Sequence, residues 1–415
     1  MKPAALGSVG ARSGAFDPLC ADAVATPVLV VLGQVAHFLT LSAIPLFLPL
    51  IREDLGISFT QAGMISAAGM LSYTIAQVPA GCLSDRYGPR RLFFAGMLAW
   101  SLLALAFGLV HAFWLALATL FVAGFFRALL FAPGLALLAS WFPRGRRATA
   151  MSLFLLGGAV GSVLVALAGP LLAARYGWRP TFMAFAAIGI ATAFLFGAGA
   201  REKPRTGPST QSPASAFALA RYPIMWVCGG LQFVRFSVVM GFGFWLPSFL
   251  VADRGMSVPE AGLVMAMSAA LSAPSPTLGA YLSDRLQNPP LVIGGALALL
   301  AGASALLPLA DSTALLLVAI AAYSILLGSY FGPLFLVPVE VMGQRAIGTA
   351  TGFGNLFANI GGFSTVLLLG SIRDHTASFT WGFLAISLAC LVGVGLAAAL
   401  SRLRSQALGA KGAAG

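Results

Sequence analysis

Long apolar stretches follow one another along almost the whole chain, and short polar segments separate them. An α-helix needs about 20 predominantly apolar residues to cross the hydrocarbon core of a bilayer, and each stretch approaches or exceeds that length. The pattern predicts an all-α polytopic membrane protein with 12 transmembrane helices, arranged as two pseudo-symmetric six-helix bundles. The predicted spans are 26–50, 59–81, 91–110, 113–142, 146–173, 180–199, 223–250, 258–282, 289–309, 312–340, 344–371 and 379–401.

Less apolar segments flank and divide these spans. We expect cytoplasmic tails at 1–25 and 402–415, a six-helix bundle over 26–199, a cytoplasmic linker over 200–222 and a second six-helix bundle over 223–401. No short apolar core with a small-residue cleavage site precedes the first span, so no removable signal peptide is expected.

Composition excludes a soluble fold. Hydrophobic residues make up 59% of the chain and charged residues only 9%, whereas soluble domains carry roughly 25% charged residues. The 4 cysteines lie far apart, which predicts neither a disulfide framework nor a metal site. Because no nucleophile–base pair and no phosphate-binding glycine loop is evident, we expect neither enzyme activity nor a cofactor.

Two halves of the chain carry matching motifs. The segment 81–91 contains Leu-Ser-Asp-Arg between two apolar runs, and a shorter copy recurs at 279–285. Phe-Ala-Pro at 131–133 likewise matches Phe-Gly-Pro at 331–333. Matched motifs in corresponding halves predict a duplicated membrane protein with a binding site between the halves, near the middle of the bilayer. A channel or receptor would not require this duplication.

The basic residues predict the orientation. Of the 24 Lys and Arg, 17 fall on the side of the tails and the linker, 5 on the other side and 2 within spans. The positive-inside rule therefore places both termini in the cytoplasm and the protein in the cell inner membrane. Since membrane topology accounts for the net charge of +12, no nucleic-acid partner is expected.

These motifs resemble the major facilitator superfamily of secondary transporters over residues 26–401. The segment 81–91 is similar to that family's loop between helices 2 and 3, and Arg127 with Pro133 is similar to its helix-4 arginine motif. No Gly-Gly follows Gly169-Pro170, unlike in drug/proton antiporters, and this weakens an assignment as a drug exporter. The stretch 339–362 resembles the organic anion/cation symporter-like branch.

The resemblance also implies a conformational latch at the cytoplasmic ends. Asp85 is expected to face the N-terminus of helix 11, and Asp284 that of helix 5, where a carboxylate meets the positive end of a helix dipole. The alternative is a basic loop that only sets orientation. The residues assigned to the latch are Gly81, Asp85, Arg86, Gly88, Arg90, Arg91, Asp284, Arg285, Glu340 and Arg345.

Three ionisable side chains, His37, Arg127 and Arg235, fall deep within predicted spans, and no Asp or Glu does. An arginine at the centre of a membrane helix costs about 2.5–3.5 kcal/mol, so it normally faces a cavity and a partner. An anionic substrate would supply the missing partner, because the planar guanidinium binds a carboxylate through two hydrogen bonds. The alternative is a structural role, with each arginine bonded to backbone carbonyls. His37 either carries a coupling proton or is a neutral packed histidine.

Further polar and aromatic residues follow helical spacing from these three. Such stripes also arise from interhelical packing, and the aromatic side chains of Phe131 and Trp245 are either ligand contacts or core. The candidate substrate-binding residues are Arg127, Arg235, His37, Gln34, Gln232, Tyr73, Gln77, Tyr323, Tyr330, Asn355 and Asn359.

The sequence therefore predicts a secondary active transporter that moves a small organic anion of carboxylate type by alternating access. Proton-coupled uptake is favoured. Anion exchange is the main alternative, and a proton-coupled drug or metabolite exporter is another. The expected partners are the small anionic substrate, protons and the lipid bilayer, and we expect a monomer.

Overall fold

The computed structural model describes residues 18–142, 147–202, 221–334, 337 and 347–413, and every element within these ranges is an α-helix. Eleven helical spans of this part are long and apolar enough to cross a membrane. The all-α class that the sequence predicts is confirmed. The helices are α1 (Pro18–Leu55), α2 (Phe59–Tyr87), α3 (Pro89–Gly108), α4 (Phe113–Ser140), α5 (Arg147–Tyr176), α6 (Trp178–Gly199), α8 (Pro223–Ala252), α9 (Val258–Ser272), α10 (Ser275–Leu286), α11 (Pro289–Leu309), α12 (Thr313–Leu326), α14 (Ile347–Thr376) and α15 (Thr380–Ala413).

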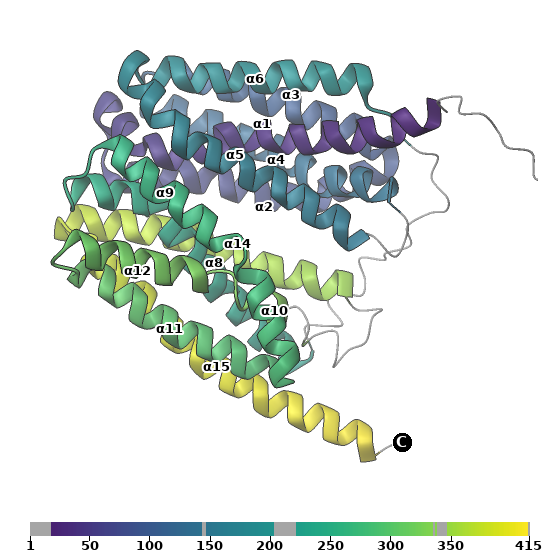
Figure 1. Cartoon of the computed structure of the whole chain (residues 1–415), viewed down its shortest axis with the longest axis vertical. Helices are drawn as coiled ribbons and strands as arrows, with labels where there is room; N and C mark the ends of the chain where they lie inside the picture. The colour runs from purple at the N-terminus through teal and green to yellow at the C-terminus, as the bar shows by residue number, and fades with distance from the viewer. Residues whose placement is uncertain (1–17, 143–146, 203–220, 335–336, 338–346, 414–415) are drawn as a thin grey trace, which may run out of the picture.

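The helices form two bundles. In the first, α2 and α3 pack against α4, and α1 packs against α5 and α6; in the second, α8 packs against α14 and α15, and α11 against α12 and α15. Figure 1 shows α1–α6 above α8–α15, with the two bundles together at one end and diverging toward the other. The two-bundle arrangement agrees with the duplication seen in the sequence.

Equivalent serine caps start equivalent helices in the two bundles. The Ser58 side chain accepts a hydrogen bond from Gln61 N at the start of α2, and the Ser257 side chain accepts one from Glu260 N at the start of α9. In both cases the side chain three residues later accepts a hydrogen bond from the backbone N–H of the capping serine. These capping boxes satisfy orphan amides at each helix start, and they define the start of α2 and α9.

Glycines set the closest helix crossings within each bundle. A Cβ on Gly161 of α5 would lie 2.5 Å from Val35 O of α1, and a Cβ on Gly361 of α14 would meet Phe233 O of α8. Small residues allow such approach in a membrane, where association relies on close packing. The two crossings are equivalent, so the bundles share one internal plan.

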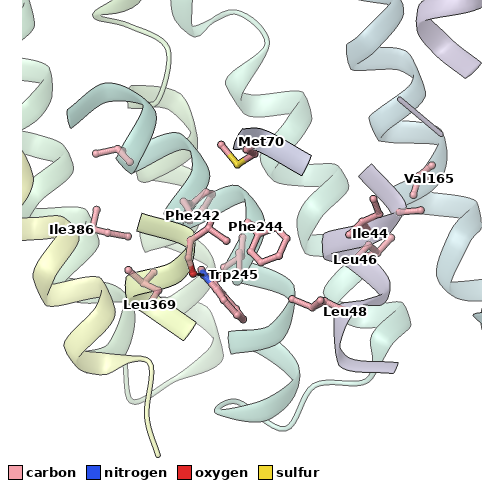
Figure 2. Packing of buried hydrophobic residues seen from close by; sticks show 14 of the residues in the cluster. Ile44, Leu46, Leu48, Met70, Val165, Phe242, Phe244, Trp245, Leu369 and Ile386 are labelled. Atoms are coloured by element: carbon pink, nitrogen blue, oxygen red, sulfur yellow. Dashed lines mark hydrogen bonds between the residues drawn. The ribbon is translucent and has the colours of Figure 1, made fainter. Parts of the chain in front are cut away.

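The bundles meet at one end through a second pair of equivalent crossings, and we call this the closed end. A Cβ on Gly63 of α2 would lie 3.0 Å from Val366 O of α14, and a Cβ on Gly262 of α9 would lie 2.6 Å from Ala166 O of α5. Figure 2 shows Trp245 and its neighbours between α14 and α1 in this region. The Trp245 indole is fully buried and donates to Val366 O at 3.1 Å.

Two predicted spans each contain a turn where they cross, although each remains one candidate membrane span, Val258–Leu286 and Thr313–Leu334. The span 258–282 divides into α9 and α10 around Pro274, and the span 312–340 leaves the helix after Leu326. At the crossing, Gly328 N donates to Ser275 Oγ at 2.9 Å, and a Cβ on Gly279 would collide with Ser329 O. The matching helices of the first bundle, α2 and α4, are continuous. The two bundles therefore differ at this crossing.

Candidate functional site

The first bundle places Arg127 of α4 against Tyr73 of α2. The guanidinium carbon lies 4.4 Å from the centre of the Tyr73 ring, a cation–π contact. Within the described residues, Arg127 makes no hydrogen bond or ion pair with another side chain or carbonyl, although it is half-buried. The structural role considered for Arg127, bonding to neighbouring carbonyls, is therefore absent from this part of the structure. Its hydrogen-bonding nitrogens remain available to a ligand.

His37 of α1 lies within electrostatic range of Arg127. Its ring is buried and meets the rings of Phe38 and Trp100 edge-on, with centroids 5.3 Å and 4.8 Å away. The Nδ1 atom has no hydrogen-bond partner among the described residues. Thr40 fixes the neighbouring tryptophan, because Trp100 Nε1 donates to Thr40 Oγ1 at 2.8 Å. His37 thus lies inside the first bundle, behind Arg127.

The second bundle holds Arg235 of α8 in a more defined setting. Arg235 is 9% exposed, and its Nε donates to Gln232 Oε1 at 2.6 Å. The guanidinium carbon lies 5.0 Å from the centre of the Phe331 ring and 5.5 Å from that of Phe236. Gln232 is the only hydrogen-bond acceptor for Arg235 among the described residues. As with Arg127, no described carboxylate pairs with this arginine.

The remaining candidates divide between the arginines and the bundle interior. Tyr323 is fully buried, donates to Val238 O at 3.1 Å and stacks on Phe242 with ring centroids 4.0 Å apart, so it packs the second bundle. Tyr330 lies in the turn after α12 instead of on the same helix face as Tyr323, within electrostatic range of Arg235. Its hydroxyl is buried and has no described partner.

Four polar candidates make fewer contacts. Asn359 Nδ2 donates to Asn355 O at 2.9 Å, one turn back on α14. Gln77 is half-buried, and Gln34 is buried against Gly157 of α5, where an added Cβ would lie 3.0 Å from Gln34 Cβ. None of these four contacts either arginine through a hydrogen bond in the described part of the chain.

The neighbourhoods of the two arginines approach each other at the seam between α2 and α14. A Cβ on Gly362 of α14 would lie 2.5 Å from the Phe236 ring and 2.8 Å from Met70 Cε. Met70 is one turn before Tyr73 on α2, and Phe236 directly follows Arg235. Among the described residues, no contact joins Arg127 to Arg235. Met70 and Phe236, which neighbour Tyr73 and Arg235 in the sequence, therefore lie on either side of Gly362 at this seam.

At the closed end, Asp374 of α14 caps α2 of the other bundle. Its carboxylate accepts hydrogen bonds from Phe59 N at 2.9 Å and Thr60 N at 2.6 Å. Arg52 lies over the Phe59 ring at 3.6 Å, and Arg373 lies 5.0 Å from the centre of the same ring. A carboxylate at a helix N-terminus meets both free amides and the positive end of the dipole. This contact links the bundles, and no sequence motif indicated it.

The equivalent crossing between α5 and α9 lacks this electrostatic contact. The chain carries Ala174 where α14 carries Asp374, and α9 has Pro259, which has no N–H, where α2 has Thr60. Among the described residues, no hydrogen bond joins α5 and α9 at that crossing, where Gly262 packs on Ala166 and Pro170. In the part of the chain that the structure describes, the Asp374 carboxylate therefore supplies the polar contact between the bundles at the closed end, through backbone amides of α2 and the Ser58 and Thr60 side chains.

Replacing Asp374 with alanine is expected to open the closed end. Removal of two charge-assisted hydrogen bonds shifts the equilibrium between conformations by about 10-fold or more. Spin labels at His111 and Asp311, which are exposed in equivalent loops of the two bundles, should report longer distances. Glu53→Ala removes an exposed acid at the same end and should leave the distances unchanged. Equal distance changes in both variants would contradict a specific role for Asp374.

The opposite end of the first bundle is organised around Gly88 and Glu202. Gly88 has a φ of +88°, and the Glu202 carboxylate lies against it and accepts a hydrogen bond from Arg90 N at 3.3 Å. Arg90 Nη2 also donates to Gly197 O at 2.8 Å, at the end of α6. Glu202 was missed in the sequence because it lies just beyond a span, in a segment assigned to the linker.

The other predicted latch residues make no described contact between the bundles. Asp284 and Arg285 are exposed on α10, which packs only against helices of its own bundle among the described elements. Arg86 and Arg91 are exposed, and nothing lies within 4 Å of a Cβ placed on Gly81. Glu340, Arg345 and the side chain of Asp85 lie outside the described residues. The latch therefore stays a prediction.

Relatives of known name share most of this chain. It is 28% identical over 387 residues to the hexuronate transporter of Bacillus subtilis, covering 85% of this chain and 88% of the relative. It is 25% identical over 367 residues to the nitrite extrusion protein of the same species, covering 86% and 89%.

The fold matches a solved structure and a family profile. A bacterial homologue of the human lysosomal transporter Spinster, in an inward-facing and occupied conformation, superposes with a TM-score of 0.76 at 20% identity, covering 92% of this chain and 96% of that one. Residues 30–366 match the sequence profile described as Major Facilitator Superfamily. The chain is therefore a multi-pass membrane transporter and not an enzyme. It belongs to the major facilitator superfamily.

Proposed function

We propose that this transporter carries a small organic anion of carboxylate type across the inner membrane. We place it in the organic anion/cation symporter-like branch, which its residues 339–362 resemble. One observation carries the proposal: Arg127 and Arg235 have no carboxylate partner among the described residues, although both lie within membrane-spanning helices. A buried unpaired charge is costly, so a partner must arrive with the ligand. The hexuronate transporter among the relatives supports a carboxylate as that partner.

Alternating access would bring the two arginines to the substrate from opposite bundles. The distribution of Lys and Arg places the closed end at the outer face of the membrane. In that orientation we infer an inward-facing conformation, in which the substrate region would open toward the cytoplasm. The expected outward-facing state would separate Asp374 from α2 and bring together the ends that carry residues 81–91 and 279–285. In the present conformation, Asp284 is exposed and there is open space around Gly81, which supports a latch that is released when the protein faces inward.

Proton-coupled uptake is the proposed direction and coupling. His37 lies within electrostatic range of Arg127 in the first bundle, so protonation at His37 would alter the charge that an anion meets. Exchange of one anion for another is the second candidate, because it requires no proton site and no described Asp or Glu lies deep in the spans. The nitrite extrusion protein among the relatives supports a smaller anion as the alternative substrate.

Counterflow into proteoliposomes tests the function. Liposomes loaded with D-glucuronate should accumulate labelled D-glucuronate, a hexuronate, and should not accumulate labelled glucose, the matched neutral sugar. An inwardly directed proton gradient should raise net uptake several-fold for a symporter, whereas strict dependence on an internal anion would favour exchange. Nitrite serves as the small-anion probe. Movement of neutral or cationic compounds alone would overturn the anion assignment.

A further inference from the structure

Gln232 holds Arg235 by one specific contact. The Gln232 amide oxygen accepts a hydrogen bond of 2.6 Å from Nε of Arg235, which lies one turn later on α8. Both side chains are buried. A hydrogen bond to a charged donor is about twice as strong as one between neutral groups. Because Nε is engaged, the plane of the guanidinium is fixed, and the two terminal nitrogens form the free edge.

Aromatic rings complete this setting. Phe331, from the segment after α12, and Phe236, from α8, lie 5.0 Å and 5.5 Å from the guanidinium carbon. Rings near a guanidinium stabilise its charge through their faces and offer no hydrogen-bond acceptor. The rings therefore help to keep the charge on Arg235 while the free edge retains both of its donor nitrogens for an oxyanion.

Gly354 of α14 supports Gln232 from behind. A Cβ at this position would lie 3.2 Å from Gln232 Cγ and 3.5 Å from its Nε2, so any larger residue would press on the glutamine side chain. Two residues earlier on the same helix, a Cβ on Gly352 would have nothing within 4 Å. The space that Gly354 leaves is therefore occupied by Gln232, whereas Gly352 faces open space.

The equivalent position in the first bundle lacks the cation. Gln34 and His37 stand where Gln232 and Arg235 stand, and a Cβ on Gly157 would lie near Val31 O and Cβ of Gln34. No described hydrogen bond joins Gln34 to His37, and His37 Nδ1 has no described partner. The first bundle instead supplies Arg127 from α4, held by the Tyr73 ring alone. The two arginines thus differ in how firmly they are oriented.

We propose that Gln232, supported by Gly354, is a positioning residue that fixes Arg235 as an end-on fork for a planar oxyanion such as a carboxylate. Gln232 acts through Arg235 and does not itself bind the substrate. This inference rests on the proposed function for the identity of the ligand. It assigns the rigid half of the substrate site to the second bundle.

The test measures two quantities for each variant, using the full-length protein in detergent. They are the melting temperature without ligand and the affinity for D-glucuronate. Gln232→Glu places a carboxylate in place of an amide oxygen against Nε of Arg235, so the melting temperature should rise by about 2 °C or more. The affinity should fall about 10- to 100-fold, because the internal carboxylate competes with the ligand. A residue that only packs the helix would lower both quantities together.

Two glycine variants provide a matched pair. Gly354→Ala should weaken D-glucuronate binding about 10-fold by displacing Gln232, and Gly352→Ala should not. In a double-mutant cycle, Gly354→Ala should have little further effect once Gln232→Ala has removed the side chain it displaces. Equal effects of the two alanines, or additive effects in the cycle, would overturn the inference.

The outcomes separate this inference from the proposed function. A wild-type protein that binds neither D-glucuronate nor nitrite would overturn the proposed function, and the ligand-free melting temperature of Gln232→Glu would still decide whether the glutamine contacts Arg235. A lower melting temperature in that variant would overturn the positioning role even if the wild type binds D-glucuronate.

Discussion

Arg127→Ala and Arg235→Ala are each expected to reduce transport of the preferred anion by about 100-fold or more. Each variant removes a charge that the described protein leaves without an acidic partner. Charge-assisted contacts to a desolvated ligand contribute about 1.5–3 kcal/mol per hydrogen bond, and a guanidinium makes two. In the proposed site the two residues act on one ligand from opposite bundles, so the loss in the double variant should be less than additive.

Lysine variants separate charge from geometry. Arg235→Lys keeps the charge and loses both the Nε bond to Gln232 and the planar fork, so the apparent affinity should fall while some transport remains. Arg127→Lys should retain more transport, because only a ring holds Arg127. Arg175→Ala, at an exposed position of the closed end, controls for the loss of one positive charge. Wild-type transport in either alanine variant would exclude the two-arginine site.

Gly279→Ala is expected to be the most destabilising single methyl addition in the second bundle. The new Cβ would collide with the backbone carbonyl of Ser329, and a backbone atom cannot rotate away as the end of a side chain can. Overpacking costs about 1–3 kcal/mol where the neighbours can shift, and more where they cannot. We expect little folded protein after extraction, measured by size-exclusion chromatography and thermal unfolding.

Gly81→Ala is the matched control, since Gly81 stands in the equivalent motif. Nothing lies within 4 Å of its added Cβ, and alanine is favoured over glycine within a helix by up to about 1 kcal/mol. Its melting temperature should therefore be equal to or above that of the wild type. Equal destabilisation of the two variants would show that the crossing of α10 with the segment after α12 does not limit stability.

The positions of the helices could be predicted from the sequence more accurately than the breaks within them. Ser58 and Ser257 mark the starts of α2 and α9 by local capping chemistry. The break at Pro274 was missed, because membrane helices tolerate proline where neighbouring groups satisfy the freed backbone. Next to the break, the Ser275 hydroxyl accepts a hydrogen bond from the backbone N–H of Gly328, which is far away in the sequence. Hydropathy carries no information about such a pairing.

The candidate site shows a similar limit. The arginines were identified because a charge within an apolar span is costly at any depth, and helical spacing correctly put Gln232 beside Arg235. Spacing alone cannot tell which face of a helix points toward the substrate, so Tyr323 was grouped with the site although its hydroxyl bonds within the bundle. Asp374 was missed as a contact because its donors lie more than 300 residues earlier, on α2.

The contact between Asp374 and α2 uses the backbone N–H groups of Phe59 and Thr60, and the hydroxyls of Ser58 and Thr60 add to it. Substitution at Phe59 or Thr60 by any residue except proline leaves those N–H groups in place, whereas the acceptor depends on one side chain. If Asp374→Ala shifts the equilibrium as expected, natural variation at this one acid can adjust how long the protein stays in this conformation. The glycine crossings and the two arginines can remain as they are, so turnover can evolve separately from substrate choice.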